Sequence, residues 1–123
     1  MTREILLIED ERNIIEAISF ILSRDGWTVR THSNGTDAAE KVRSLRPDVV
    51  ILDVMLPGRS GYDILRELRG EPAFADLPIL MLTARGQARD REMAESAGVS
   101  AYMTKPFSNS EMLDAVRALA PVP

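Results

Sequence analysis

The chain has 123 residues, of which 45% are apolar and 28% charged, a composition typical of one soluble globular domain. Its formal net charge of −4 argues against sequence-independent nucleic-acid binding, which needs clustered lysine and arginine against phosphates. No apolar run approaches the ~20 residues of a membrane helix, no signal peptide opens the chain, and no cysteine is present for disulfides or thiolate metal sites. We therefore expect a cytoplasmic protein without direct nucleic-acid or membrane contacts.

Five short apolar segments are predicted to be β-strands. The third, Val49 to Leu52, consists of four apolar residues of which three are β-branched, which is typical of a strand buried on both faces. The second, Trp27 to Thr31, is more polar and is expected near a sheet edge, with His32 in the loop after it. In chain order the predicted strands are 4–8, 27–31, 49–53, 79–82 and 101–103.

A helical pattern of apolar residues follows each predicted strand. The first pattern places Ile14, Ile18 and Leu22 on one face, and Asp25-Gly26 stops it. Ser108 is the predicted N-cap of the last helix. The other three predicted helices are 38–45, 62–69 and 89–97, the last with Met93, Ala94 and Ala97 as its apolar stripe, and residues 70–78 are expected to form a loop.

This alternation of strand and helix predicts the fold class. Five repeats of the pair indicate a parallel sheet with helices on both faces. We expect a flavodoxin-like, doubly wound (βα)5 three-layer α/β sandwich whose five parallel strands have the order 2-1-3-4-5. Residues 1–120 would form this domain, and residues 121–123 a tail or a truncated linker.

Polar residues stand at the carboxyl ends of four predicted strands. Glu9 and Asp10 follow the first strand, Asp53 ends the third, Thr83 ends the fourth and Lys105 follows the fifth. Ligands of doubly wound sheets bind outside these ends, where the strand order reverses, and in the predicted order that point lies between strands one and three. The five side chains are therefore expected to converge on one pocket.

Three carboxylates in one pocket repel each other and need positive charge nearby. Lys105 supplies one charge, and the remainder favours a hard cation that prefers oxygen ligands, Mg²⁺ or alternatively Mn²⁺. A metal beside a free carboxylate, a hydroxyl and an ammonium is suited to phosphoryl transfer. Asp53 would be the nucleophile and would form an aspartyl phosphate.

These strand ends also carry a resemblance to a known family. The matching pieces are Glu9-Asp10-Glu11, Asp53-Val54-Met55-Leu56-Pro57 with Gly61, Thr83-Ala84, and Tyr102 with Lys105-Pro106-Phe107. Over essentially its whole length the chain resembles the receiver domain of bacterial two-component response regulators, in its stand-alone form.

The resemblance implies that Asp53 accepts a phosphoryl group from a histidine kinase or a histidine phosphotransfer protein. Asp10 and Asp53 would bind Mg²⁺ directly, together with the backbone carbonyl of Met55, while Glu9 would reach the metal through water. The phosphoryl oxygens would be held by Thr83 and Lys105 and by backbone N–H groups of Val54, Met55 and Ala84.

The resemblance also implies a conformational switch. Thr83 would move toward the phosphoryl group and Tyr102 would turn inward, which changes the face made by helix four, strand five and helix five. That face would control a downstream effector protein, with the chain a monomer or, when phosphorylated, a dimer through the same face. The Lys105–Pro106 bond of the family is cis, so we expect it to be cis here.

Other functions remain open on the sequence. A metal-dependent phosphohydrolase would need a second acid where Met55 stands, and a flavodoxin-type cofactor binder would need a phosphate-cradling loop after the first strand. A non-phosphorylated receiver-like interaction module would lack one or more pocket residues. We expect no turnover of an external metabolite, only self-catalysed phosphorylation and hydrolysis, with slow hydrolysis because neither Met55 nor Arg85 can orient water as a carboxamide or act as an acid or base.

Overall fold

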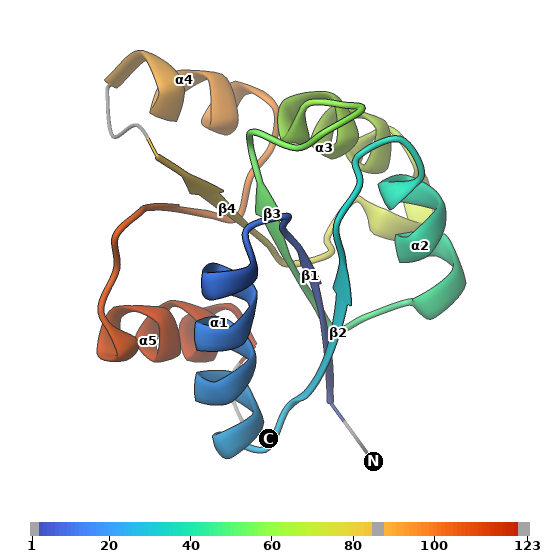
Figure 1. The fold of residues 1–123 in the computed structure, drawn as a ribbon. Coiled ribbons are helices and arrows are strands. Elements are labelled where there is room, and N and C mark those ends of the chain that lie inside the picture. Colours follow the sequence, from blue (N-terminus) through green and yellow to red (C-terminus); the bar gives the residue numbers. More distant parts are fainter. Residues whose placement is uncertain (1–2, 85–87, 121–123) are drawn as a thin grey trace.

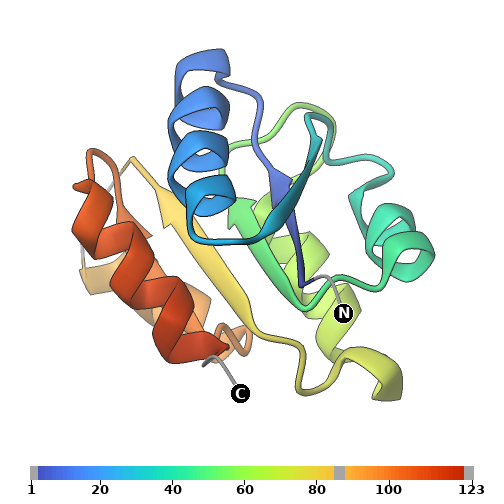
Figure 2. The same cartoon turned by 90° about the horizontal axis from the view of Figure 1, so that it is seen from below.

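The computed structural model describes residues 3–84 and 88–120. These residues form one parallel sheet of five strands in the order β2-β1-β3-β4-β5, with helices on both faces (Figure 1). Figure 2, seen from below, shows β1 between β2 and β3. The predicted fold class and strand order are confirmed.

The elements alternate along the chain as the sequence pattern predicts. The strands are β1 (Glu4–Ile8), β2 (Thr28–His32), β3 (Val49–Asp53), β4 (Ile79–Thr83) and β5 (Ala101–Thr104). The α-helices are α1 (Arg12–Arg24), α2 (Ala38–Leu45), α3 (Gly61–Arg69), α4 (Ala88–Ser96) and α5 (Asn109–Leu119), and a short 3₁₀ helix, η1, spans Pro72–Phe74.

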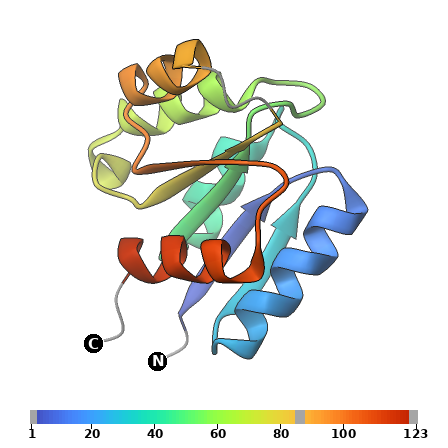
Figure 3. The same ribbon diagram turned by 90° about the vertical axis from the view of Figure 1, so that its left-hand side faces the viewer.

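Two apolar cores lie on opposite faces of the sheet because successive side chains of a strand point to opposite sides. Ile5 and Leu7 of β1 pack with α1 and α5, whereas Leu6 and Ile8 pack with α2, α3 and α4. The same division of the helices is visible in Figure 3. Every residue of β3 and β4 is buried, so the two central strands are fixed by packing from both sides.

One predicted helix cap and one predicted cis peptide bond are present. Ser108 caps α5: its Oγ accepts from the Glu111 N–H at 3.1 Å, and its own N–H donates to Glu111 Oε1 at 3.1 Å. The Lys105–Pro106 peptide bond is cis, as expected. The predicted tail, 121–123, lies outside the described residues. Within 3–84 and 88–120, no helix has the length and apolar character needed to span a membrane.

Three local predictions were wrong. The segment expected as a loop contains η1, because Pro72 begins a helical turn that buries Phe74 in the core. Strand β2 includes His32, whose Nε2 lies 2.7 Å from Asp37 Oδ1. Met93 is not part of an inward stripe: 39% of it is exposed, and Ala94 is the buried residue of α4.

Candidate functional site

An acidic cluster lies at the carboxyl ends of β1 and β3. Asp53 ends β3 and is 2% exposed, Glu9 follows β1 and is fully buried, and Asp10 is exposed beside them. One carboxylate oxygen from each of the three lies within 4.8 Å of the others. The first three predicted site residues therefore meet where the strand order reverses.

Lys105 closes this cluster from the end of β5. Its Nζ lies 2.7 Å from Glu9 Oε1, 3.2 Å from Glu11 Oε1 and 3.5 Å from Asp53 Oδ2. Its backbone N–H donates to the Thr83 carbonyl at 2.7 Å, which fixes the start of the β5–α5 loop against β4. The ammonium therefore lies within ion-pair distance of three carboxylates.

The turn after β1 holds the Glu9 carboxylate in place. Glu9 Oε2 accepts from the Asp10 N–H at 2.9 Å and from the Glu11 N–H at 3.2 Å. The Glu9 N–H donates to the His32 carbonyl of β2 at 2.9 Å. A buried carboxylate costs free energy unless it is hydrogen-bonded and paired, and here two amides and one ammonium supply both.

The backbone amides expected to contact a phosphoryl group differ in what they face in the unphosphorylated structure. The Met55 N–H lies 3.4 Å from Asp53 Oδ1, a long contact. The Val54 N–H donates to the Leu82 carbonyl at 3.0 Å, so it is already engaged in this conformation. Ala84 is exposed at the end of β4. The Met55 amide is therefore directed at Asp53, whereas the Val54 amide is directed at β4.

Burial and crowding shift the titration of the cluster. Burial, with Glu9 as hydrogen-bond partner and neighbouring charge, raises the pKa of Asp53 to about 7. Burial also acts to raise the pKa of Glu9, but hydrogen bonds with Asp53 and Lys105 outweigh it and that pKa is lowered. For Lys105, burial opposes the charge, yet the carboxylates prevail and its pKa is raised. Of the two acids, Glu9 is thus the one that ionises more readily beside Lys105, and Asp53 the one that keeps its proton to higher pH.

Thr83 and Tyr102 lie together on the adjacent strands β4 and β5. Thr83 is 3% exposed at the end of β4. Burial raises the pKa of Tyr102, while a hydrogen bond with the Thr83 side chain acts in the opposite direction. The guanidinium of Arg91, from α4, stacks over the Tyr102 ring at 5.5 Å from its centroid. Tyr102 therefore connects Thr83 with α4.

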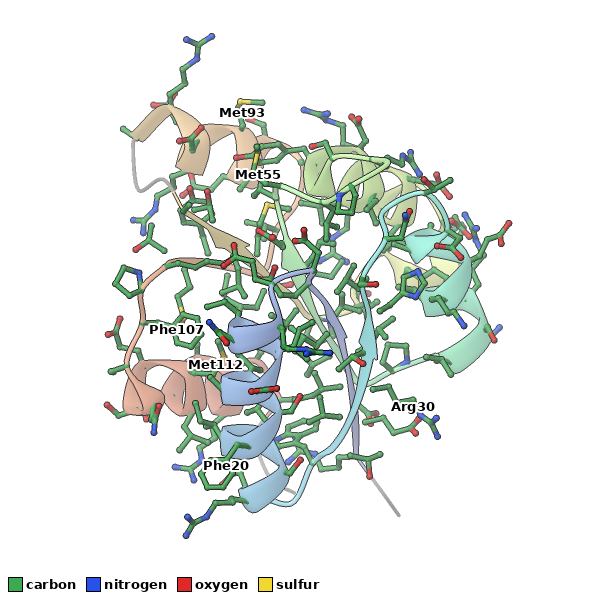
Figure 4. All side chains as sticks on the ribbon, viewed as in Figure 1. Phe20, Arg30, Met55, Met93, Phe107 and Met112 are labelled. Carbon is green, nitrogen blue, oxygen red and sulfur yellow. The ribbon has the colours of Figure 1, made fainter. Side chains whose placement is uncertain are left out.

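A pocket of about 510 Å³ opens beside Thr83, between the loop after β3 and α4. Its walls are Val54, Met55, Tyr62, Thr83, Ala84, Asp90 and Met93. Met55, 75% exposed, and Met93 lie at the same end of the molecule, as Figure 4 shows. Asp53 is not among the described residues that line this pocket.

Two residues of the quoted motifs have structural roles that the sequence did not reveal. Glu11 extends its side chain to Lys105, although no role was assigned to it; the third acid in a row was the only signal. Gly61 begins α3 directly against the backbone of Asp53, where an added Cβ would lie 2.3 Å from the Asp53 carbonyl oxygen. A side chain there would displace the end of β3.

The cluster suits a hard divalent cation. Glu9, Asp10 and Asp53 offer oxygen ligands only, the donor type of Mg²⁺ and Mn²⁺ sites. The three acids and Glu11 together bring four carboxylates to this site, and the Lys105 ammonium pairs with three of them, which leaves negative charge that a cation would compensate. The composition of the site thus fits the predicted metal.

A doubly wound sheet with acids and a lysine at its carboxyl ends defines a class of signalling domain, and comparison with known proteins gives the family. The chain belongs to the response regulator receiver domain family of two-component systems, whose sequence model matches residues 5–117.

Similarity to individual proteins supports this family assignment. The chain is 44% identical over 115 residues to a probable transcriptional regulatory protein, TcrX, of Mycobacterium tuberculosis, covering 94% of this chain and 48% of that one. It therefore spans about half the length of this relative. The crystal structure of a putative response regulator from Chloroflexus aurantiacus J-10-fl is 32% identical in sequence to this chain and has a TM-score of 0.92. The match covers 97% of this chain and 98% of that one.

A third comparison concerns a metal-bound structure. The receiver domain of sensor histidine kinase PA1611 from Pseudomonas aeruginosa PAO1 was solved with a magnesium ion coordinated in its active site cleft. It is 31% identical to this chain with a TM-score of 0.88, and the match covers 97% of this chain and 98% of that one.

Proposed function

We propose that this receiver domain is a phosphorylation switch in which Asp53 accepts a phosphoryl group from a histidine kinase or a histidine phosphotransfer protein. The observation that carries the proposal is the position of Asp53, buried at the end of β3 beside two further acids and 3.5 Å from Lys105. We place the reaction in the cytoplasm and expect no turnover of an external metabolite.

Asp53 acts as the nucleophile. One of its carboxylate oxygens attacks the phosphorus of the donor, the bond from phosphorus to the donor histidine nitrogen breaks, and the imidazole leaves with the electron pair. The attacking group must be ionised, and the raised pKa of Asp53 means that the metal-free site resists this near neutral pH. Lys105 favours the ionised form and then faces the phosphoryl oxygens with Thr83.

Asp10, Asp53 and the Met55 carbonyl would hold Mg²⁺, with Glu9 linked to the metal through water. When bound, the cation neutralises carboxylate and phosphoryl charge during transfer. Support comes from the oxygen-only donor set and from the magnesium ion in the Pseudomonas aeruginosa relative.

Thr83 and Tyr102 would carry the signal to the face formed by α4, β5 and α5. Their hydrogen bond and the stacking of Arg91 on the Tyr102 ring connect the phosphorylation pocket with α4. A shift of Thr83 toward the phosphoryl group would break this arrangement and let the ring repack, which alters the surface offered to an effector protein or to a second copy of the chain.

Hydrolysis of the aspartyl phosphate is proposed to be slow. The thioether of Met55, two residues after Asp53, is exposed and offers neither an acid, a base nor a carboxamide to an attacking water. Arg85, the second residue named in this prediction, lies outside the described residues. We expect a phosphoryl lifetime of minutes or longer, and a lifetime of seconds would refute this part of the proposal.

The function is tested by intact-protein mass spectrometry after incubation with Mg²⁺ and acetyl phosphate. One added phosphoryl group is expected, and it should be absent in Asp53→Asn and in the presence of chelator. If no adduct forms, beryllofluoride, a mimic of the phosphoryl group, separates poor use of the donor from an inert site. A wild-type protein that binds neither would instead be a non-phosphorylated interaction module.

A further inference from the structure

The Lys105 ammonium has three carboxylate neighbours that differ in how firmly they are held. Glu9 is the closest at 2.7 Å and is fully buried, Glu11 follows at 3.2 Å, and Asp53 lies at 3.5 Å. The Glu11 side chain is 60% exposed, whereas those of Glu9 and Asp53 are 0% and 3% exposed. Glu11 is thus the one partner of Lys105 in this group that water can readily solvate.

The ion pair between Glu11 and Lys105 does not result from a capping role of the Glu11 side chain. Glu11 occupies the N-cap position of α1, but its side chain makes no capping hydrogen bond. Through its backbone, Glu11 donates its N–H to Glu9 Oε2 at 3.2 Å, and its carbonyl accepts from the Ile15 N–H at 3.0 Å. A substitution that changes only the side-chain charge therefore leaves the backbone contact with Glu9 intact.

A phosphoryl group on Asp53 would need the ammonium that Glu11 occupies. An ammonium has three N–H donors, and three carboxylates already lie around that of Lys105. Phosphorylation removes the charge of the Asp53 carboxylate itself but adds phosphoryl oxygens that carry more negative charge. Glu9 is retained by two amides and by burial, so the exposed Glu11 is the neighbour that can leave at the lowest cost.

We propose that Glu11 is a competing anion that positions Lys105 in the unphosphorylated state and is displaced when the phosphoryl group binds. This inference rests on the proposed phosphorylation of Asp53. It makes Glu11 a positioning residue that acts through Lys105 and weakens the binding of phosphoryl groups and their mimics. Removing its charge should strengthen that binding.

The test compares wild type with Glu11→Gln and with Glu16→Gln. Glu16 is exposed on α1 and is not among the carboxylates within ion-pair distance of Lys105 in the described part of the chain, so its variant controls for net charge. The dissociation constant of beryllofluoride at saturating Mg²⁺ is measured by NMR titration at low and high salt. Glu11→Gln should bind about two- to fivefold more tightly than wild type, the range for an ion pair with one exposed partner.

Salt separates this role from a merely structural one. The advantage of Glu11→Gln should shrink at high salt, because salt screens the exposed Glu11–Lys105 pair in wild type. Equal affinities of Glu11→Gln and Glu16→Gln, or weaker binding by Glu11→Gln, would overturn the inference while leaving the phosphorylation proposal intact. If folded wild type shows no saturable binding of beryllofluoride, both proposals fail together. This outcome is distinguishable from failure of the Glu11 inference alone, in which wild type still binds beryllofluoride.

Discussion

Lys105 lies closer to Glu9 than to Asp53: its Nζ is 2.7 Å from Glu9 Oε1 and 3.5 Å from Asp53 Oδ2. The residue proposed to carry the phosphoryl group is therefore not the principal partner of the only ammonium seen in the cluster of the described structure. Asp53 is instead buried next to a second acid, and its pKa rises to about 7 from an ordinary 3.8. This relationship makes the metal-free site sensitive to pH.

The metal-free protein should lose stability as the pH rises from 5 to 8. Between the ordinary and the raised pKa, the folded state keeps a proton on Asp53 that the unfolded chain has released, so the free energy of unfolding falls with pH. The pKa of Glu9 is lowered from its ordinary 4.5, so its opposite effect is already largely complete at pH 5, where this window begins. We expect a loss of roughly 2–4 kcal/mol from this group, measured by urea unfolding in chelator. In Asp53→Asn the loss should be largely absent, and parallel pH profiles of the two proteins would contradict the assignment.

Mg²⁺ should stabilise the folded protein, and more so at high pH. The carboxylates must be deprotonated to bind the metal, so the affinity should rise as the pH passes through 7. At a hundredfold excess over the dissociation constant the gain is about 2.7 kcal/mol, measurable as a rise in thermal midpoint. Asp10→Asn should bind Mg²⁺ more weakly, and an equal response of this variant would exclude Asp10 as a ligand.

Replacing Lys105 should destabilise the protein more at pH 8 than at pH 5. Lys105→Gln leaves Glu9 buried without its cation, which we expect to cost roughly 3 kcal/mol at pH 8. At pH 5 the cost should be smaller, because the Glu9–Asp53 pair can retain a proton. Lys41→Gln, at an exposed position of α2, should change the free energy of unfolding by less than about 0.5 kcal/mol. A cost for Lys105→Gln that does not vary with pH would argue against electrostatics as its cause.

Gly61→Ala should destabilise the protein and disturb the site together. The added Cβ would lie 2.3 Å from the Asp53 carbonyl oxygen and 3.0 Å from the Val54 Cα, so the end of β3 must move. We expect a cost of roughly 1–3 kcal/mol and shifts of the NMR signals around Asp53. Gly70→Ala is the matched control: its Cβ would meet nothing closer than 3.4 Å, and its effect should stay below about 1 kcal/mol. Similar effects of the two substitutions would contradict the close-approach explanation.

The sequence pattern alone was sufficient to predict the strands and helices and the order of the strands in the sheet. Four apolar residues before Asp53 require a strand buried on both faces, and the alternation with amphipathic helices restricts the sheet to few topologies. Once the strands are parallel, residues that follow different strands must meet at one edge. For this reason the sequence is sufficient to place Glu9, Asp10, Asp53 and Lys105 together.

What the tertiary structure decided is how these side chains divide their contacts. The preference of Lys105 for Glu9 over Asp53, and its contact with Glu11, depend on ångström-scale distances between residues more than 50 positions apart. The exposure of Met93 likewise depends on how α4 packs. Local patterns fix hydrogen bonding and periodicity over a few residues, whereas these distances result from packing the whole sheet against its helices. The sequence by itself determined which groups meet, and the packed fold determined which of them pair.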